Sequence, residues 1–184
     1  MSASCDSWPT RFSSEPGGPL NLVLRPAAPA DLPQLVRLCA EHAEFEQAAF
    51  EDDGQADRLA VFLFGPRPAA YCLVVAQADQ LLGFATYMPE FSTWNSAYYL
   101  HLDCLFLQPG LRGIGLGRRL LTAVAREAQR LGCPLVQWQT PTSNTNAIAF
   151  YRQLGASEKS KLRFYLDPAR YLAQHPVPGA AGTV

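Results

Sequence analysis

Hydrophobic and polar positions along the chain follow two different periods, one typical of strands and one typical of helices. Short apolar runs predict strands at residues 21–25, 71–76, 81–88, 98–107, 135–140 and 162–166. Apolar positions spaced i, i+3, i+4 predict helices at residues 32–43, 56–64, 117–131 and 145–154. The resulting order, β-α-α-β-β-β-α-β-α-β, predicts a mixed α/β fold, in which a mixed and mostly antiparallel sheet is flanked by helices on both faces.

Local signals set the limits of these elements. Gly132 and Pro134 follow the third predicted helix and end it, and Asn144 can cap the fourth. Between the two ends of the chain there is neither an internal repeat nor a linker, so residues 20–170 are expected to form one domain. Residues 1–19 are rich in Ser, Pro and Gly and are expected to form a flexible leader, and residues 171–184 a C-terminal tail.

Composition and charge narrow the class of function. The 184 residues are 48% hydrophobic and 17% charged, which is typical of a globular domain. A formal net charge of −1 argues against a nucleic-acid partner and favours a small polar or charged ligand. The sequence contains neither a signal-like N-terminus nor a run of about 20 apolar residues, so no membrane association is expected. Five scattered cysteines without a C-x-x-C pair predict neither a disulfide framework nor a metal site, and indicate a reducing, cytoplasmic location.

A glycine-rich loop connects the predicted strand at 98–107 to the following helix. Glycines at 113, 115 and 117 let backbone N–H groups face a ligand, and a helix N-terminus adds partial positive charge, so the loop suits a pyrophosphate. Arg112, Arg118 and Arg119 add further charge. Glycine content alone fits a plain strand–helix turn equally well. The spacing matches neither a Walker A loop nor the G-x-G-x-x-G dinucleotide fingerprint.

Two motifs together resemble the GNAT superfamily of N-acetyltransferases. The run Arg112-Gly-Ile-Gly-Leu-Gly117, preceded by Leu107-Gln-Pro109, is similar to the family's Q/R-x-x-G-x-G/A loop. The run Asn144-Thr-Asn-Ala-Ile-Ala-Phe-Tyr151 is similar to its N-x-x-A-x-x-x-Y segment. The resemblance covers roughly residues 21–167 and implies the GNAT fold with acetyl-CoA as co-substrate. It implies that the cofactor contacts Leu105, Phe106, Leu107, Arg112, Gly113, Ile114, Gly115, Leu116, Gly117, Arg118, Asn144 and Phe150.

Within the superfamily the chain most resembles the diamine (spermidine/spermine) acetyltransferase-like branch, whose acidic groups hold a polyamine and whose members usually form a homodimer. The resemblance places Glu46, Trp94 and Asp103 on the acceptor side. Cys104 replaces a second carboxylate, and Ser92 and Thr93 stand where another acid is expected. The expected pocket is therefore less acidic than the branch pattern, which argues against polyamines as acceptors.

Acetyl transfer to an amine requires a neutral amine, a donor for the oxyanion and a proton for the departing thiolate. The resemblance implies that Tyr151 is the general acid and that the N–H of Leu105 supplies the oxyanion donor. Direct proton abstraction by Asp103 would be uphill by about 6.5 pKa units, so Asp103 is expected to bind the ammonium and pass its proton through water. His101 is either a relay on the same strand face or an ordinary histidine beside tyrosines.

The sequence thus predicts an N-acetyltransferase for a primary amine of a small molecule. Two alternatives remain open at this point. One keeps the fold and the reaction but changes the acceptor to a protein N-terminus or a lysine. The other is a catalytically idle sensor that only binds coenzyme A.

Overall fold

A computed structural model describes residues 22–176, which divide into two units. The first unit runs to Pro141 and the second begins at Thr142, and each is described by itself. The first unit contains the strands β1 (Leu22–Pro26), β2 (Tyr71–Gln77), β3 (Gln80–Ser92), β4 (Ala97–Leu107) and β5 (Val136–Gln137) and the helices α1 (Leu32–Phe45), α2 (Gln55–Phe64) and α3 (Leu116–Arg130), with short 3-10 turns η1 (Pro29–Asp31) and η2 (Pro109–Leu111). The second unit contains α4 (Thr145–Gln153) and α5 (Pro168–Gln174).

The sheet of the first unit has the strand order β1-β2-β3-β4-β5. The first four strands pair antiparallel with their neighbours in sequence. Short turns join β2 to β3 and β3 to β4, whereas α1 and α2 lie between β1 and β2. Only β5 runs parallel to its neighbour, and its register with β4 covers two residue pairs, Leu100 with Val136 and His101 with Gln137. The sheet is therefore mixed and mostly antiparallel, as predicted.

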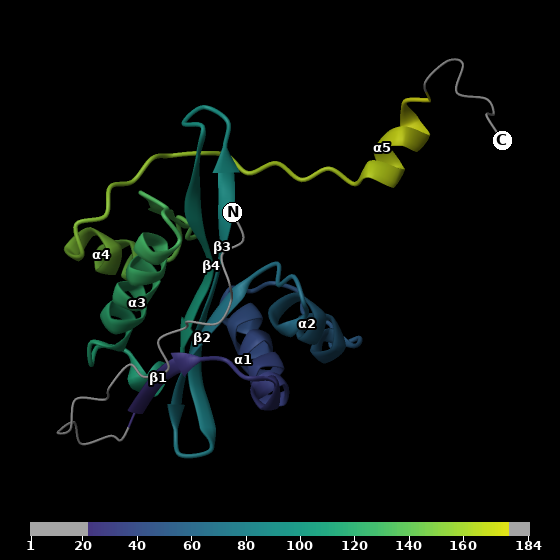
Figure 1. The fold of residues 1–184 in the computed structure, drawn as a ribbon. Helices are drawn as coiled ribbons and strands as arrows, with labels where there is room; N and C mark the ends of the chain where they lie inside the picture. The colour runs from purple at the N-terminus through teal and green to yellow at the C-terminus, as the bar shows by residue number, and fades with distance from the viewer. Residues whose placement is uncertain (1–21, 177–184) are drawn as a thin grey trace. The chain divides into compact units, whose positions relative to one another are not determined.

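Helices cover both faces of this sheet (Figure 1). On one face the buried side chains of α1, such as Leu35 and Leu38, pack against Phe84 of β3 and Phe106 of β4. On the other face α3 packs on β4, with Leu120 in contact with the cluster that includes Leu100 and Leu102. Apolar residues at helical spacing thus build the two layers that the sequence predicts.

A β-bulge in β4 changes which face its residues occupy. Thr86 pairs with Cys104 and the next residue, Tyr87, pairs with Leu102, so Asp103 is the extra residue. Before the bulge Leu102 belongs to the α3-side core, and after it Cys104 packs against the α1-side core. A bulge redirects side chains in this way because one unpaired residue shifts the two-residue alternation. Cys104 thereby faces α1.

The start of α1 is fixed beside β1 by a partly buried ion pair. Arg25 donates two hydrogen bonds to Asp31, at 2.6 and 2.8 Å, and the Ala28 N–H donates a third at 2.7 Å. The Arg25 guanidinium is the main reason that the pKa of Asp31 lies below its usual value. Gln34 ties the same helix to the β2–β3 turn through Asp79 and Leu81. These contacts set the position of the helix whose later turns line the cavity described below.

The C-terminal part of the chain differs from the prediction. The strand expected at residues 162–166 does not form, and the five residues are irregular and exposed. A strand needs a partner for its backbone groups, and the described part of the second unit contains no other strand. The helix α5 crosses the predicted boundary between domain and tail at residue 170. The predicted strand at 135–140 shortens to β5, whereas that at 81–88 lengthens to β3.

The predicted leader at 1–19 and the end of the predicted tail, from residue 177, lie outside the described residues. Among the residues described, 22–176, no helix has the length and apolar character needed to cross a membrane.

Candidate active site

The glycine loop after β4 forms an open, donor-lined turn at the N-terminus of α3. Gly113 and Gly115 have positive φ angles of 82° and 88°, which glycine adopts without steric cost. Gly115 is the N-cap residue of α3, and no side chain caps the helix. A Cβ atom added at either glycine would meet nothing within 4 Å. The N–H groups of the first turn of α3 therefore border open space, as a pyrophosphate site requires.

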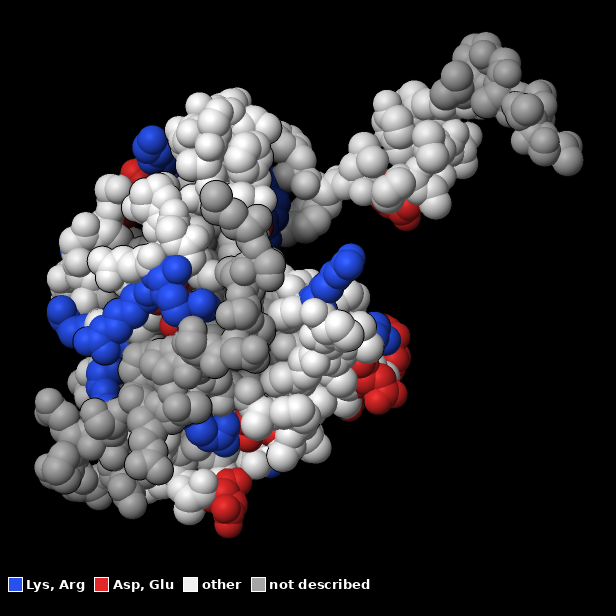
Figure 2. All heavy atoms as spheres, in the orientation of Figure 1, with Lys and Arg blue, Asp and Glu red and all other residues white. Residues whose placement is uncertain are grey.

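Basic side chains accompany the loop. Figure 2 shows Lys and Arg side chains gathered over the region of α3, a helix that carries Arg118, Arg119, Arg126 and Arg130. Arg112 is held differently, because its Nε donates to the Leu107 carbonyl at 3.2 Å and its guanidinium lies 4.2 Å from the centre of the Phe45 ring. Arg112 thus links the end of β4 to the end of α1 while adding positive charge beside the loop.

The edge of β4 next to the loop is unpaired over its last residues, since its register with β5 covers only Leu100 and His101. The Gln108 N–H donates to the Leu82 carbonyl of β3 at 3.0 Å. The alternation of an antiparallel ladder then turns the backbone groups of Leu105 and Leu107 away from β3. The Leu105 N–H therefore points to the open edge, where the predicted oxyanion donor has to point.

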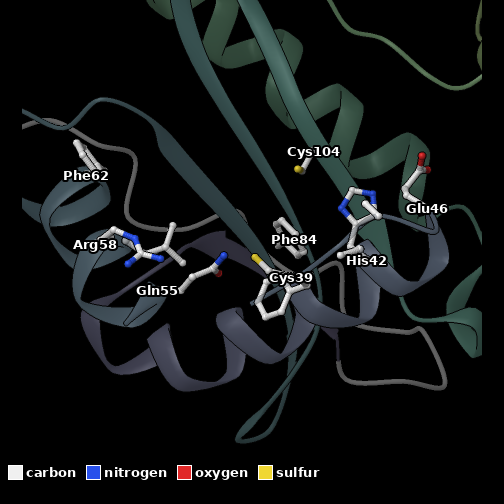
Figure 3. Close-up of a pocket in the computed structure, with 12 residues that line it drawn as sticks. Cys39, His42, Glu46, Gln55, Arg58, Phe62, Phe84 and Cys104 are labelled. Atoms are coloured by element: carbon white, nitrogen blue, oxygen red, sulfur yellow. The ribbon is translucent and has the colours of Figure 1, made fainter. Parts of the chain in front are cut away.

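A cavity of about 520 Å³ lies on the α1 side of the sheet (Figure 3). Its walls come from α1, α2, the segment between them, β3 and β4. They comprise Cys39, His42, Ala43, Glu46, Ala48, Phe50, Gln55, Arg58, Leu59, Phe62, Phe84 and Cys104. Most of these side chains are apolar, and the few polar ones, such as Glu46 and Arg58, stand apart from each other. A volume of this size with a few placed polar groups suits a small molecule.

Asp103 adjoins this cavity by way of the bulge. Its Oδ2 accepts a hydrogen bond from Thr86 Oγ1 at 3.4 Å and from the Cys104 thiol at 3.6 Å. Its charge also acts on Cys39 and His42 of α1. Of the three predicted acceptor residues, Glu46 therefore lines the cavity and Asp103 lies next to it, in contact with the lining residue Cys104.

Trp94 lies elsewhere in the first unit. It sits in the tight turn between β3 and β4 with 96% of its surface exposed. Ser92 at the turn lies six positions along β3 from Thr86, which binds Asp103, a span of about 20 Å at strand spacing. Trp94 therefore does not line the cavity of its own chain. His101 does not line it either.

The two thiols of the cavity are protonated at neutral pH. Burial first and the Asp103 carboxylate second raise the pKa of Cys39 to about 11 and that of Cys104 to about 12. Thiolates are the reactive and metal-binding form of cysteine. Among the described residues no group of three His, Cys, Asp or Glu side chains could hold a metal ion. Cys39 and Cys104 consequently act as walls of the cavity.

Sequence reasoning missed His42, although its spacing gave a signal. Cys39 and His42 are three positions apart, and Glu46, the C-cap of α1, follows four positions later, so the three lie along one face of the helix and its end. The helical pattern counted Cys39 and Ala43 as core and passed over the histidine between them. The imidazole stacks on Phe106 with ring centres 5.2 Å apart and meets Phe84 edge-on at 6.0 Å.

The second unit carries the other predicted site residues. Asn144 caps α4, because its Oδ1 accepts a hydrogen bond from the Ala147 N–H at 3.2 Å. Tyr151 lies in the last turn of α4, with its ring centre 5.2 Å from that of Phe150. Asn144 therefore has a structural role, and the predicted cofactor and catalytic roles of Asn144, Phe150 and Tyr151 stay predictions.

Comparison with known proteins identifies the family to which the chain belongs. The model of the acetyltransferase (GNAT) family matches residues 35–156, which include the glycine loop and α4. A mouse thialysine N-epsilon-acetyltransferase is 26% identical over 152 residues, covering 78% of this chain and 89% of the relative. A human spermidine/spermine N(1)-acetyltransferase-like protein is 26% identical over 144 residues, covering 74% of this chain and 21% of the relative.

Among solved structures, an aminoglycoside N-acetyltransferase in complex with CoA superposes with a TM-score of 0.67 at 19% identity, covering 83% of this chain and 98% of that one. At this identity the match supports the fold. The match of the family model over both sequence motifs confirms the predicted family, activity and co-substrate. The chain belongs to the GNAT family of acetyltransferases and is an acetyl-CoA-dependent N-acetyltransferase.

Proposed function

We propose that the enzyme acetylates the primary amine of a small molecule that enters the cavity between α1, α2, β3 and β4. The observation that carries the proposal is the pairing of this cavity with Glu46 and Asp103. Both carboxylates can attract an ammonium group, and Asp103 belongs to the strand that continues into the Leu105 edge and the glycine loop. The cavity is large enough for a small amine. The relatives of the enzyme include an acetyltransferase named for thialysine, a small lysine analogue.

The charges of the cavity favour an amine that also carries an acid group. Figure 3 shows Gln55 and Arg58 on one side of Cys39 and Phe84, and His42 and Glu46 on the other. The Arg58 guanidinium is bound to Asp53 at 2.5 Å and lines the cavity. A polycation would meet two carboxylates and a cation, whereas a zwitterion can place its ammonium near Glu46 and its carboxylate near Arg58. Amino-acid-like amines are therefore the proposed acceptors.

Monoamines and amino-acid-like amines are expected to exceed spermidine in kcat/KM by at least tenfold. Cys104, a thiol in the cavity wall where the branch pattern has a carboxylate, removes an acidic contact that a polyamine would use. A contact between charged groups is worth about 1.5–3 kcal/mol, so its loss costs a polycation more than a single ammonium. Initial rates with acetyl-CoA and a panel of monoamines, thialysine, lysine, ornithine and spermidine measure this. Spermidine as the best acceptor would contradict the proposed pocket.

Asp103→Asn serves as the matched variant in the same assay. It keeps the size of the side chain and removes the charge that binds the ammonium. Turnover is expected to fall for every amine, and the pH profile of kcat/KM is expected to move upward, because more of the amine must then lose its proton in solution. An unchanged pH profile would show that Asp103 does not bind the ammonium group of the acceptor.

Three further roles complete the proposal. Backbone N–H groups of the glycine loop and of Leu105 hold the pyrophosphate and the thioester oxygen, and Arg112 and Arg118 add charge. Asn144 and Phe150 lie next to the cofactor. Tyr151 gives its proton to the departing thiolate. The support for the last two assignments is the family motif at residues 144–151.

We also propose a homodimer in the cytoplasm. Cys39, Cys72, Cys104 and Cys133 are all unpaired thiols, which a reducing compartment maintains. The tip of the β3–β4 hairpin exposes Trp94, and the 162–166 segment exposes Leu162, Phe164, Tyr165 and Leu166. Exposed apolar side chains that follow closely along one segment, as at 162–166, are typical of interfaces. Contact with a second copy would also give Trp94 a route to an acceptor cavity.

The dimer is testable by light scattering. The wild type is expected to have about twice the 20.2 kDa mass of one chain, and Phe164→Asp, which places a charge in the exposed segment, is expected to weaken the association. The matched control is Val61→Asp, which places the same charge on an exposed side chain of α2. A monomeric wild type at micromolar concentration would contradict the homodimer.

A further inference from the structure

His42 lines the acceptor cavity, and the two nitrogens of its ring form no hydrogen bond with the described part of the protein. Its imidazole lies between Cys104 and Glu46 in Figure 3 and lines the cavity with both. Within residues 22–176 no hydrogen bond is formed by either ring nitrogen. Phe106 stacks on the ring at 28° and Phe84 meets it at 75°, so aromatic contacts fix the ring. The nitrogens are thereby left available to a molecule in the cavity.

The charged groups around His42 come from three directions. Glu46 directly follows the same helix, Asp103 lies on β4 and Arg112 in the loop after η2, while the thiols of Cys39 and Cys104 line the cavity beside them. Burial lowers the pKa of His42 below its usual value, Arg112 adds to this, and Glu46 and Asp103 oppose it. The net result is a neutral imidazole at pH 7. The carboxylates of Glu46 and Asp103 can stabilise the imidazolium that forms when His42 accepts a proton.

We propose that His42 is a catalytic residue that accepts the proton of the acceptor ammonium, an inference that rests on the proposed function. The ammonium gives one proton to a ring nitrogen and becomes a neutral amine. The nitrogen lone pair of the amine then forms a bond to the thioester carbonyl carbon, and the C–S bond breaks. The thiolate takes a proton, which the proposed function assigns to Tyr151, and the imidazolium releases its proton to solvent.

Reference pKa values favour this histidine over the carboxylates as the acceptor of the proton. An amine titrates near 10.4, an imidazole near 6.5 and an aspartate near 3.9. Transfer to an imidazole is therefore unfavourable by about four orders of magnitude, against about six and a half for Asp103. His101, the candidate relay of the sequence, lies on the strand next to Gln137 and outside the cavity. Asp103 and Glu46 then serve to hold the ammonium.

His42→Gln tests the proposal through the pH dependence of kcat/KM for a lysine-like acceptor. In the wild type, kcat/KM is expected to fall at acid pH, because the imidazole, whose pKa lies below its usual value, becomes protonated there and can no longer accept a proton. The variant is expected to lose this acid limb, to be about 100-fold slower at pH 7 and to approach the wild-type rate as the pH nears that of the amine's own titration. A rate reduced equally at every pH would overturn the proposal.

An acceptor that is already neutral at pH 7, such as a hydroxylamine or an aromatic amine, separates base catalysis from packing. The rate of His42→Gln with this acceptor is expected to be within threefold of the wild type. His101→Gln is the matched control and should keep the wild-type profile with both acceptors. Equal losses with neutral and protonated acceptors would give His42 a structural role alone.

His42→Ala provides a second readout, since added imidazole can enter the space left by the ring. Imidazole is expected to restore the rate in proportion to its concentration, and more strongly above its own pKa. No rescue, together with an unchanged pH profile in His42→Gln, would exclude His42. If the wild type acetylated no amine at all, the proposed function itself would fail, so the two failures are distinguishable.

Discussion

Tyr151→Phe is expected to lower kcat about 100-fold while leaving the affinity for coenzyme A nearly unchanged. The expected size is at the low end of general acid catalysis. A phenol titrates near pH 10 and a thiol near 8.5, so proton transfer to the thiolate is uphill by only about 2 kcal/mol, and the removal of the hydroxyl leaves the thiolate without this donor. Steady-state kinetics with a saturating amine measure kcat, and calorimetry measures coenzyme A affinity.

Tyr165→Phe is the matched control, because it removes a hydroxyl from an exposed tyrosine of the same unit. It should keep wild-type turnover. Full activity in Tyr151→Phe would make Tyr151 a packing residue of α4. Loss of coenzyme A affinity in that variant would instead assign it to binding.

Gly115→Asp is expected to reduce the affinity for coenzyme A at least a hundredfold, or about 2.7 kcal/mol. Gly115 is the N-cap of α3, and aspartate is a favoured residue at such a position. Its carboxylate would accept the N–H groups of the first helical turn and repel a pyrophosphate at the same place. The strain of a side chain at a φ of 88° and the stabilising cap act in opposite directions, so the variant is expected to fold while losing its ligand.

Calorimetry and thermal unfolding measure the two consequences together. Coenzyme A is expected to raise the unfolding temperature of the wild type and not that of Gly115→Asp, because only a bound ligand stabilises the folded state. Gly132→Asp is the control, since Gly132 also has a positive φ, of 70°, and no neighbour within 4 Å of an added Cβ. Unchanged affinity in a folded Gly115→Asp would remove the loop from the cofactor site.

The parts of the fold that depend on local signals could be predicted from the sequence. The apolar stripe of α3 is local, and so are the glycine loop and the Asn144 cap of α4, which the structure has at the predicted residues. The bulge at Asp103 could not be predicted, because it arises from the pairing of β4 with β3. The strand expected at residues 162–166 failed for a similar reason, since its formation depends on a partner strand and not on its own apolar residues.

The cofactor loop and the acceptor cavity also differ in how far local sequence signals reveal them. The glycine loop is one continuous segment, so its residue types and spacing reveal it. The acceptor cavity takes its residues from five parts of the chain, and most of them, such as Phe84 and Cys104, have the character of core residues when each segment is considered alone. His42 belongs to this group, because a single histidine within an apolar stripe can be assigned a role only when the structure brings it into one cavity with Cys104 and near the charge of Asp103.

The quantity that tests the central claim most directly is the product formed from acetyl-CoA and a small primary amine. Mass spectrometry of the reaction mixture is expected to find an N-acetylated amine and free coenzyme A in equal amounts for at least one amino-acid-like amine, and neither product with Gly115→Asp. A wild-type protein that binds coenzyme A but forms no N-acetylated product from any amine, amino acid or peptide would contradict the account and indicate a coenzyme A-binding sensor.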